Sequence, residues 1–416
     1  MSNLHVAFVG LGYIGLPTAV VLANSGVNVT GIDVNAANVE RINRGEVTIV
    51  EPGLQEELTQ ALESGRFRAT TEQVHANAYI IAVPTPFTDT HDVDMKFIYS
   101  AAESIAPQLE GDELVVLEST SPPQTTAKMA KRLLELRPDL TADGTENPNN
   151  KPVIYFAHCP ERILPGYAMK ELRTNDRIIG GQTPEATRRA TEIYSTFCDG
   201  ELLATNDVTA EMAKLTENSF RDVNIAFANE LSLICDKLGI DVWELIELAN
   251  HHPRVNILQP GPGVGGHCIA VDPWFIVAAD PENSKLIHTA RNVNDGKPTW
   301  VIDKVKKVVT DTNASKIAVL GLAFKADIDD LRESPALSIA VDLAEELEDK
   351  TIFAVEPNVS ELPKRLKGFE NVELRDYQAA IAAADVVLLL VDHKEFRSMD
   401  TAVLDGKTVI DTKGLF

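Results

Sequence analysis

The residues that point most directly to chemistry end a glycine-rich loop, PGPGVGGHC at positions 260–268, with Asp272 four residues beyond Cys268. Glycine supplies almost no side chain to pack, but it lets the backbone bend sharply and approach a ligand closely. A thiol at the end of such a loop is predicted to be a nucleophile, with Asp272 orienting it or a nearby lysine. Cys198 and Cys235 lie in apolar helical patterns and fit the alternative of a small buried hydrophobe.

A lysine and an amide are placed to assist such a nucleophile. Lys214 and Asn218 lie four residues apart in a helical pattern and therefore share one face, which Arg221 continues. Facing a reactive thiol, they would stabilise a developing oxyanion. Taken alone, the spacing favours the alternative of a solvated helix face, on which Lys214 pairs with Glu211 or Glu217.

Glu161 offers a carboxylate for proton transfer. It belongs to the sequence CPER at 159–162, which follows a predicted strand at 153–157, so it lies at the carboxyl end of that strand. A carboxylate there could act as a general base. The competing interpretation is a structural ion pair with Arg162.

Residues 10–15, GLGYIG, match the pattern G-x-G-x-x-G between a predicted strand and a predicted helix. Gly10 permits the tight turn, Gly12 lets the backbone approach a pyrophosphate, and Gly15 allows the helix to pack closely on the sheet. The helix N-terminus attracts the anion. Asp33 ends the second strand, where a carboxylate binds ribose hydroxyls and repels a 2′-phosphate, so NAD is favoured over NADP.

Two further loops follow predicted strands, VPTP at 83–86 and ESTSP at 118–122. Ligands of open parallel sheets bind at the carboxyl ends of strands. Pro, Ser and Thr are also ordinary turn residues, and both interpretations fit. The predicted cofactor contacts are Gly10, Gly12, Tyr13, Ile14, Gly15, Asp33, Thr85 and Thr120.

Basic residues later in the chain are available for a second anion. Lys325 ends GLAFK at 321–325, Arg332 lies in DLRESP at 330–335, and Arg254 precedes the glycine-rich loop. Each of them singly also fits ordinary surface charge. Because the formal charge of the chain is −24, an anionic ligand would need cations that converge locally.

The first half of the chain alternates short apolar segments with amphipathic runs such as 94–107 and 125–136. This alternation is typical of a parallel sheet that is covered on both faces. The polar segment 139–152 is predicted to be an exposed loop. The candidate strands are 4–9, 28–33, 78–83, 114–118, 153–157 and 177–180.

The pattern then becomes helical. One run from about 208 to about 238 contains neither Pro nor Gly and ends before Gly239, and helical patterns follow at 241–250 and 284–309. A second alternation of strands and helices closes the chain, so we predict an α/β region, a helical region and a further α/β region. The later strands are expected at 316–321, 351–355, 385–391 and 408–411.

Composition narrows the class of protein. A chain of 416 residues is too long for one ordinary core, and two or three domains are expected. The acidic charge argues against a nucleic-acid surface, and no apolar run reaches membrane-spanning length. No signal peptide is evident, and the four cysteines lack metal-ligand spacing. We therefore expect a cytoplasmic protein with reduced thiols and no metal site.

Together these motifs resemble the UDP-glucose/GDP-mannose 6-dehydrogenase family over the whole chain. The resemblance implies two Rossmann-like, doubly wound parallel-sheet domains joined by a long central helix and a helical middle domain. It also implies a homodimer or a higher homo-oligomer. The implied domains are an NAD-binding domain at 1–204, a central domain at 205–313 and a UDP-sugar-binding domain at 314–416. The segments that carry the resemblance are GLGYIGLP, VPTPF, CPER, AEMAKLTENSFRDVNIAFANE, HPRVNILQPGPGVGGHCIAVDPWF and GLAFKADIDDLRESP.

The resemblance further implies the reaction, an NAD-dependent four-electron oxidation of a UDP-sugar at C6 that uses two NAD. The central and cysteine-loop motifs favour UDP-N-acetyl-D-mannosamine as the sugar, with UDP-N-acetylglucosamine and UDP-glucose as alternatives. Cys268 would form a thiohemiacetal and then a thioester. The other implied roles are Glu161 as base for hydrolysis, Lys214 and Asn218 for oxyanions, Asp272 for support, Thr120 for cofactor and water, and Arg221, Arg254, Gly265, Lys325 and Arg332 for the substrate.

One position departs from the family pattern, since Gln124 stands where a glycine often follows Ser-Pro-Pro. The departure concerns the start of the next helix and not the chemistry.

Two other hypotheses about the function compete with this resemblance. A two-electron hydroxyacid dehydrogenase would explain neither the Cys268 loop nor the second α/β region. An NAD-responsive binding module without chemistry would not need the intact set of Cys268, Lys214, Asn218, Glu161 and Asp272.

Overall fold

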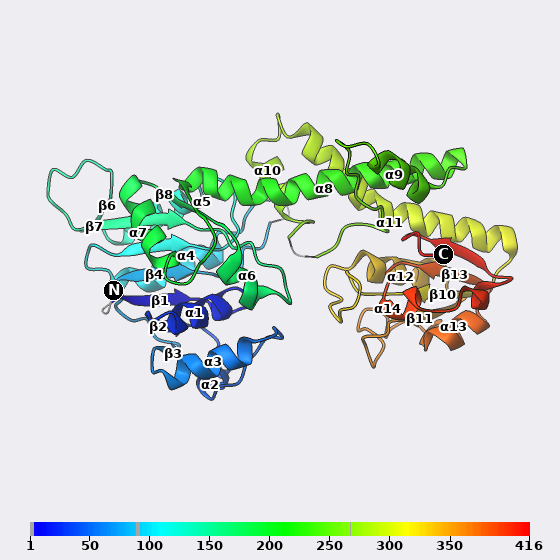
Figure 1. The fold of residues 1–416 in the computed structure, drawn as a ribbon, viewed down its shortest axis with the longest axis horizontal. Helices are drawn as coiled ribbons and strands as arrows, with labels where there is room; N and C mark the ends of the chain where they lie inside the picture. The colour runs from blue at the N-terminus through cyan, green and yellow to red at the C-terminus, as the bar shows by residue number, and fades with distance from the viewer. Residues whose placement is uncertain (1–3, 89–91, 267) are drawn as a thin grey trace. The chain divides into compact units, whose positions relative to one another are not determined.

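The computed structural model describes residues 4–88, 92–266 and 268–416, so His267 of the glycine-rich loop lies outside the described residues. The chain forms two compact units, 1–216 and 217–416, each with its own sheet (Figure 1).

The sheet of the first unit has the order β3-β2-β1-β4-β5-β7-β8-β9, and β6 pairs with β7. Every pairing is parallel except that of β7 with β8, in which Ala157 lies opposite Gly181. The expectation of an all-parallel sheet is wrong at this one pair. The strands are β1 His5–Val9, β2 Asn28–Ile32, β3 Phe67–Thr70, β4 Ala78–Ile81, β5 Leu114–Leu117, β6 Thr141–Ala142, β7 Val153–His158, β8 Arg177–Gly181 and β9 Leu202–Asn206.

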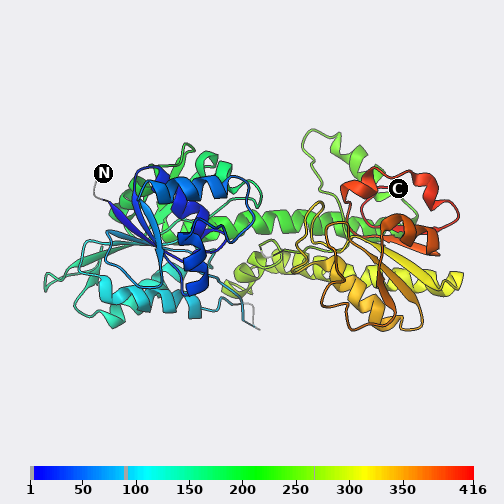
Figure 2. The same cartoon turned by 90° about the horizontal axis from the view of Figure 1, so that it is seen from below.

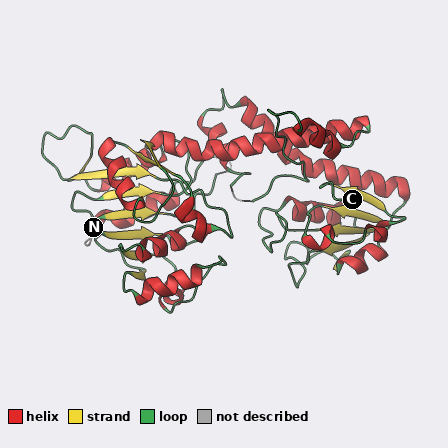
Figure 3. Cartoon of the chain, viewed as in Figure 1, coloured by secondary structure: helices red, strands yellow, loops and turns green. Residues whose placement is uncertain are grey.

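Helices cover both faces of this sheet (Figure 3). Side chains alternate along a strand, so Phe8 joins the cluster that packs under α1 and α3, whereas Ala7 joins the cluster under α4 and α5. This two-sided burial explains why the strands are continuously apolar. The helices are α1 Gly15–Asn24, α2 Ala36–Asn43, α3 Leu54–Glu63, α4 Lys96–Ile105 with the 3-10 turn Ala106–Gln108, α5 Thr125–Leu136, α6 Ala168–Thr174 and α7 Pro184–Tyr194.

A helix of 32 residues, α8 Asp207–Leu238, begins in the first unit and continues in the second. At 1.5 Å per residue it is about 48 Å long. Figures 1 and 2 both show its later part beside α11, and hydrogen bonds such as Asn229 Nδ2 to Asn294 Oδ1 at 2.8 Å join the two helices. The other helices here are α9 Val242–Asn250, α10 Asp272–Ala279 and α11 Lys285–Thr312.

The second unit contains a fully parallel sheet of order β12-β11-β10-β13-β14. Two apolar clusters again lie on its two faces, because Val319 joins one and Ala318 the other. Ser334 caps α12 by accepting a hydrogen bond from Leu337 N at 3.2 Å. The elements are β10 Lys316–Leu320, β11 Thr351–Val355, β12 Val372–Leu374, β13 Val386–Leu389, β14 Thr408–Asp411, α12 Pro335–Glu346, α13 Tyr377–Ala383, α14 Lys394–Arg397 and the 3-10 turn Thr401–Leu404.

All ten predicted strands are present within one or two residues of their expected ends, and the fold class is confirmed. Four short strands, β3, β6, β9 and β12, were not predicted. β9 is an edge strand with an exposed residue at three of its five positions, so it lacks an apolar signal. β6 lies inside the segment 139–152, which was expected to be loop throughout.

Candidate active site

The turn after β1 has the geometry that a bound dinucleotide requires. Gly10 has φ of +97°, and a Cβ atom there would lie 2.4 Å from the carbonyl oxygen of Ala82. A Cβ atom on Gly15 would lie 1.8 Å from Gly10 O, which keeps α1 close to the turn. A Cβ atom on Gly12 would meet nothing within 4 Å, so Gly12 faces open space. No acidic residue lies in the first turn of α1, which therefore suits a pyrophosphate.

Asp33 lies directly after β2 and beside this turn. Its Oδ2 accepts a hydrogen bond from Leu11 N at 3.0 Å, and its Oδ1 accepts one from Asn35 N at 2.8 Å. These bonds fix the half-buried carboxylate at the position from which ribose hydroxyls are bound. The residues of the turn thus fit NAD.

Tyr13 and Ile14 occupy the two positions before Gly15. The Tyr13 hydroxyl donates to buried Glu51, whose oxygens also accept hydrogen bonds from Gly166 N and Ala168 N, both at 2.8 Å. Burial, followed by the bond to Glu51, raises the pKa of Tyr13. The Tyr13 ring is therefore anchored beside the glycine turn by a contact that the sequence did not predict.

Thr85 and Thr120 are half-buried and follow β4 and β5 at their carboxyl ends, as predicted. Gln124 precedes α5 and has a left-handed backbone, with φ of +72°. Its backbone N–H donates to Glu211 Oε2 at 2.6 Å, and Glu211 Oε1 accepts from Thr126 N at 2.7 Å. The left-handed backbone explains why glycine suits this position.

Glu211 is fully buried by these contacts, and burial raises its pKa to about 7. It binds the start of α5, so the alternative in which Glu211 pairs with Lys214 is wrong. Lys214 is half-buried on α8, one turn before Asn218.

Glu161 is 8% exposed and is held by three donors. Its Oε1 accepts from Arg162 N at 2.6 Å and Ile163 N at 3.1 Å, and its Oε2 accepts from the guanidinium of Arg177 at 2.8 Å. The ion-pair partner is therefore Arg177 on β8, and the predicted alternative of a pair with Arg162 is wrong. No local spacing links positions 161 and 177; the antiparallel pairing of β7 with β8 brings them together.

Cys268 is exposed, and its backbone begins the turn that leads into α10. Its carbonyl oxygen accepts hydrogen bonds from Val271 N at 3.1 Å and from Asp272 N at 2.9 Å. Asp272 is 3% exposed, and its Oδ2 accepts from Asn218 Nδ2 at 2.5 Å. The structure thus brings together Asn218 and Asp272, which lie 54 positions apart in the sequence. Asp272 lies one turn after the cysteine.

The glycines before Cys268 are required by close packing. A Cβ atom on Gly265 would lie 2.5 Å from Glu333 O, and Gly266, with φ of +85°, lies against the ring of Phe324. Gly261 N donates to Asn229 Oδ1 at 2.9 Å. No local pattern predicted a role for Asn229, because only the packing of α8 on α11 shows that it is buried.

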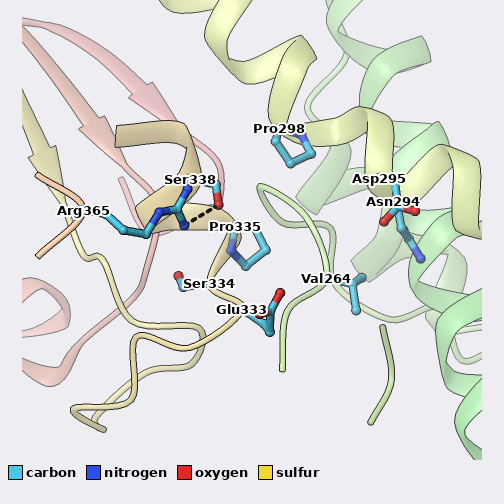
Figure 4. Close-up of a pocket in the computed structure, with 9 residues that line it drawn as sticks. All are labelled: Val264, Asn294, Asp295, Pro298, Glu333, Ser334, Pro335, Ser338 and Arg365. Atoms are coloured by element: carbon cyan, nitrogen blue, oxygen red, sulfur yellow. Dashed lines mark hydrogen bonds between the residues drawn. The ribbon is translucent and has the colours of Figure 1, made fainter. Parts of the chain in front are cut away.

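A cavity of about 190 Å³ lies behind the loop (Figure 4). Val264 of the loop, α11 and the start of α12 line it, and Arg365 donates to Ser338 Oγ at 3.1 Å at one side. Ligand pockets usually measure roughly 300–1,000 Å³, so this cavity is too small for a nucleotide sugar.

Three of the predicted substrate cations in the second unit, Arg221, Arg254 and Lys325, are exposed. Within the described ranges none of their charged groups makes a hydrogen bond or ion pair. Arg332 differs, because its guanidinium binds both oxygens of Asp330, at 2.9 and 2.7 Å. Unpaired cations on so acidic a chain are suited to an anionic ligand.

The turn after β10 repeats the first one with a different carboxylate. Leu322 N and Ala323 N donate to Glu356 Oε2 at 2.8 and 3.0 Å, and His393 Nε2 lies 3.0 Å from the same oxygen. Glu356 is 4% exposed, whereas Asp33 remains half-buried at its turn. Of these two turns, only that of the first unit therefore has a carboxylate accessible to ribose hydroxyls.

A dinucleotide turn, a second parallel-sheet unit and an exposed cysteine beside an Asn–Asp pair define a nucleotide-dependent dehydrogenase. Comparison with known proteins gives the family. Profiles of the UDP-glucose/GDP-mannose dehydrogenase family match residues 4–198 (NAD binding domain), 208–296 (central domain) and 318–416 (UDP binding domain).

Individual relatives agree with these matches. The chain is 55% identical to the UDP-N-acetyl-D-mannosamine dehydrogenase of Salmonella typhi, with full coverage of both chains. It is 53% identical to the NDP-N-acetyl-D-galactosaminuronic acid dehydrogenase of Ralstonia nicotianae, over 99% of this chain and 96% of the relative. The solved structure of the UDP-D-ManNAc dehydrogenase of Pyrococcus horikoshii is 36% identical, with a TM-score of 0.86 and coverage of 99% and 96%.

The chain belongs to the UDP-glucose/GDP-mannose dehydrogenase family. It is therefore an NAD-dependent oxidoreductase of UDP-sugars, with NAD bound by the first domain. Among the described residues, no helix is both long and apolar enough to span a membrane. No cluster of three His, Cys, Asp or Glu side chains suited to a metal ion occurs among them.

Proposed function

We propose that the protein oxidises UDP-N-acetyl-D-mannosamine at C6 to UDP-N-acetyl-D-mannosaminuronate, with Cys268 as the covalent nucleophile. The observation that carries the proposal is the exposed Cys268 at the start of α10, one turn before an Asp272 carboxylate that binds Asn218. The full-length similarity to UDP-N-acetyl-D-mannosamine dehydrogenase supports the choice of sugar.

Gly10, Gly12, Gly15 and Asp33 would hold NAD, and two NAD molecules in succession would supply the oxidising power by each taking one hydride from C6. The first loss of hydride, with release of the C6 hydroxyl proton to water, would give the C6 aldehyde. Cys268 Sγ attacks the C6 aldehyde, so that a C–S bond forms and the carbonyl oxygen becomes an oxyanion. Lys214 and Asn218 stabilise that oxyanion. Loss of the remaining C6 hydride leaves a thioester on Cys268.

Water then completes the reaction. Its oxygen attacks the thioester carbon, its proton passes to Glu161, and the C–S bond breaks to return the Cys268 thiolate. Asp272 holds the Asn218 amide in place, since Asn218 Nδ2 donates to its carboxylate. Thr120, at the end of β5, orients the water and contacts the cofactor. Trapping the aldehyde on sulfur keeps it from escaping between the two oxidations.

The substrate contacts proposed here are Arg221, Arg254, Gly265, Lys325 and Arg332. Arg254 and Lys325 are unpaired cations suited to the diphosphate. Arg332 would first have to leave Asp330. The proposed domains are an NAD-binding domain at 1–204, a central dimerisation and catalytic domain at 205–313 and a UDP-sugar-binding domain at 314–416, with Glu161 and Thr120 of the first domain and Arg221, Arg254 and Gly265 of the second also contributing to the site.

We also propose a homodimer built on α8. Phe220, Phe227 and Ile234 recur every seven residues on the helix and are 69%, 54% and 46% exposed, and Leu238 nearby is 64% exposed. Side chains seven apart form one stripe, and an exposed apolar stripe of this kind fits a second helix. A cytoplasmic location agrees with the need for a reduced Cys268.

The stoichiometry of NADH tests the proposal. UDP-N-acetylmannosamine, UDP-N-acetylglucosamine, UDP-N-acetylgalactosamine and UDP-glucose are assayed side by side, and NADH formed is compared with sugar consumed. Two NADH per sugar, with the mannosamine substrate fastest, is expected. One NADH per sugar would exclude the four-electron reaction. Two NADH per sugar with another sugar preferred would overturn only the choice of sugar. The galactosamine substrate is included because of the relative from Ralstonia nicotianae.

A further inference from the structure

A buried arginine of the first unit, Arg177, has no role in the chemistry described so far. It lies on β8 with 3% of its surface exposed, and its guanidinium carbon is 5.2 Å from the ring centroids of both Tyr194 and Phe197. A buried ion pair is weak evidence for stability, because well-packed apolar residues often do as well. Its presence at this position therefore calls for another reason.

Arg177 connects the Glu161 loop to the sheet. The two backbone donors to Glu161, Arg162 N and Ile163 N, belong to the same loop and move with it. The Arg177 bond at 2.8 Å is the one side-chain contact among the described residues that ties this carboxylate to a strand. A carboxylate has about four acceptor sites, and these three donors leave about one for a water molecule.

A second carboxylate faces the same guanidinium. Glu118, after β5, is 1% exposed; its Oε1 lies 3.7 Å from Arg177 and accepts from the Tyr194 hydroxyl at 3.2 Å. Burial, and then the charge of Glu161, raises the pKa of Glu118 to about 8, against the opposing effect of Arg177. At neutral pH Glu118 is therefore largely protonated, and the shorter ion pair of Arg177 is the one with Glu161, at 2.8 Å.

The surroundings of Glu161 contain few other titratable groups. They include Glu118 after β5, Cys159 after β7, Arg162 beside Glu161 in the chain, Arg177 on β8 and Tyr194 on α7. Burial raises the pKa of the Cys159 thiol to about 12, so it stays neutral. Burial likewise raises the pKa of Tyr194.

We propose that Arg177 is a positioning residue, which directs the Glu161 carboxylate at the water that hydrolyses the thioester. The inference rests on the proposed function, which assigns that hydrolysis to Glu161. In this step the water oxygen bonds to C6, the proton moves to Glu161 and the C–S bond breaks, with no change of oxidation state.

The test uses the full-length enzyme with NAD and UDP-N-acetylmannosamine under single-turnover conditions. NADH absorbance reports both oxidations, and the intact mass of quenched samples reports the acyl-enzyme. In Arg177→Met, the acyl-enzyme is expected to accumulate and to decay at least tenfold more slowly, while the first oxidation keeps its rate. Arg177→Lys should recover part of the loss, because it keeps the charge but loses the fork geometry.

The pH profile of acyl-enzyme decay gives a readout that a structural role would not move. Because Arg177→Met removes the charge that contacts the base, its pH profile of acyl-enzyme decay should differ from that of wild type. Arg173→Met is the matched control, because Arg173 also pairs with a glutamate in this unit, Glu57 at 2.9 Å. It should keep both the decay rate and the profile.

The outcomes separate the two proposals. A folded Arg177→Met enzyme with normal decay and an unchanged profile, or with a raised KM alone, would overturn the role of Arg177. If Arg177→Met does not fold, Arg177→Lys decides by the decay rate, and decay as fast as in wild type would overturn the role of Arg177. Glu161→Gln is run in parallel; if it also hydrolyses the acyl-enzyme normally, the assignment of Glu161 itself fails, and the inference fails with it.

Discussion

At the scale of residues, the proposed chemistry depends on Cys268, Asn218 and Asp272. Asn218 and Asp272 are both buried, and the 2.5 Å bond between them fixes the amide from which an oxyanion contact is expected. Cys268 is exposed one turn away, and the proposed mechanism has its sulfur attack C6. The roles of these three residues are separable by substitution.

Cys268→Ser is expected to abolish full turnover. A serine hydroxyl is far less ionised than a thiol near neutral pH, so the aldehyde is trapped slowly, and any ester formed would hydrolyse slowly. Rapid-mixing absorbance should show at most a small burst of NADH, with a slowly decaying adduct by intact mass. Cys198→Ser, at a half-buried cysteine, is the control that should retain activity. Full activity of Cys268→Ser would rule out the covalent mechanism.

Gln124 gives a prediction about stability. A non-glycine residue at φ of +72° costs of order 1–3 kcal/mol, and glycine recovers most of this at an entropic cost of roughly 0.5–1 kcal/mol. Gln124→Gly should therefore raise the free energy of unfolding by about 1 kcal/mol, as measured in urea. Its N–H bond to Glu211 is kept. Thr125→Gly, inside α5, should instead destabilise; a loss in both variants would contradict the strain argument.

At the scale of elements, the packing of α8 on α11 buries an unusual number of polar groups. Arg291 is fully buried and donates to Asp222 at 2.5 Å, and Asn294 joins Asp222 to Asn229. The last of these holds the backbone of the glycine-rich loop at Gly261. The two helices therefore act as a rigid support for the loop that carries the cysteine.

Lys297 in this interface predicts a pH dependence of stability. It is 3% exposed and donates to Ser232 Oγ at 2.5 Å. Burial, aided by Lys304 and opposed by Asp236, lowers its pKa from 10.5 to about 8. Between these values the unfolded chain binds more protons than the folded one, so the free energy of unfolding should rise with pH, by roughly 3 kcal/mol in total.

Urea denaturation at intervals from pH 7.5 to 10.5 would measure this rise. Lys297→Met should remove it, because no proton is then released at this site on folding. Lys307→Met changes an exposed lysine of the same helix and should leave it intact. If the free energy of unfolding rises equally with pH in wild type and in Lys297→Met, the lysine is not the source of the rise.

At the scale of the whole molecule, charge and assembly matter most. A chain of net charge −24 repels anions in general, so the exposed cations Arg221, Arg254 and Lys325 are suited to select one. The exposed stripe on α8 supports the proposed homodimer.

Phe227→Arg should break the homodimer, because it introduces a charge into the centre of the apolar stripe. Sedimentation is expected to give the dimer mass for wild type and 45.4 kDa for the variant. Leu248→Arg, at an equally exposed leucine on α9, should stay dimeric. A dimeric Phe227→Arg would place the interface elsewhere, and a monomeric wild type would remove the proposal.

The sequence alone determined the two α/β regions, the long helix between them and the dinucleotide turn, because these depend on local periodicity and on glycine at fixed spacings. It also singled out Cys268, since a thiol among glycines has no packing role. Tertiary structure decided the partners. Glu161 meets Arg177 through an antiparallel strand pair, Asn218 meets Asp272 across 54 positions, and Glu211 binds α5 instead of Lys214. Such pairs arise from burial between distant segments, where unpaired polar groups are costly, and no local spacing encodes which distant group satisfies them.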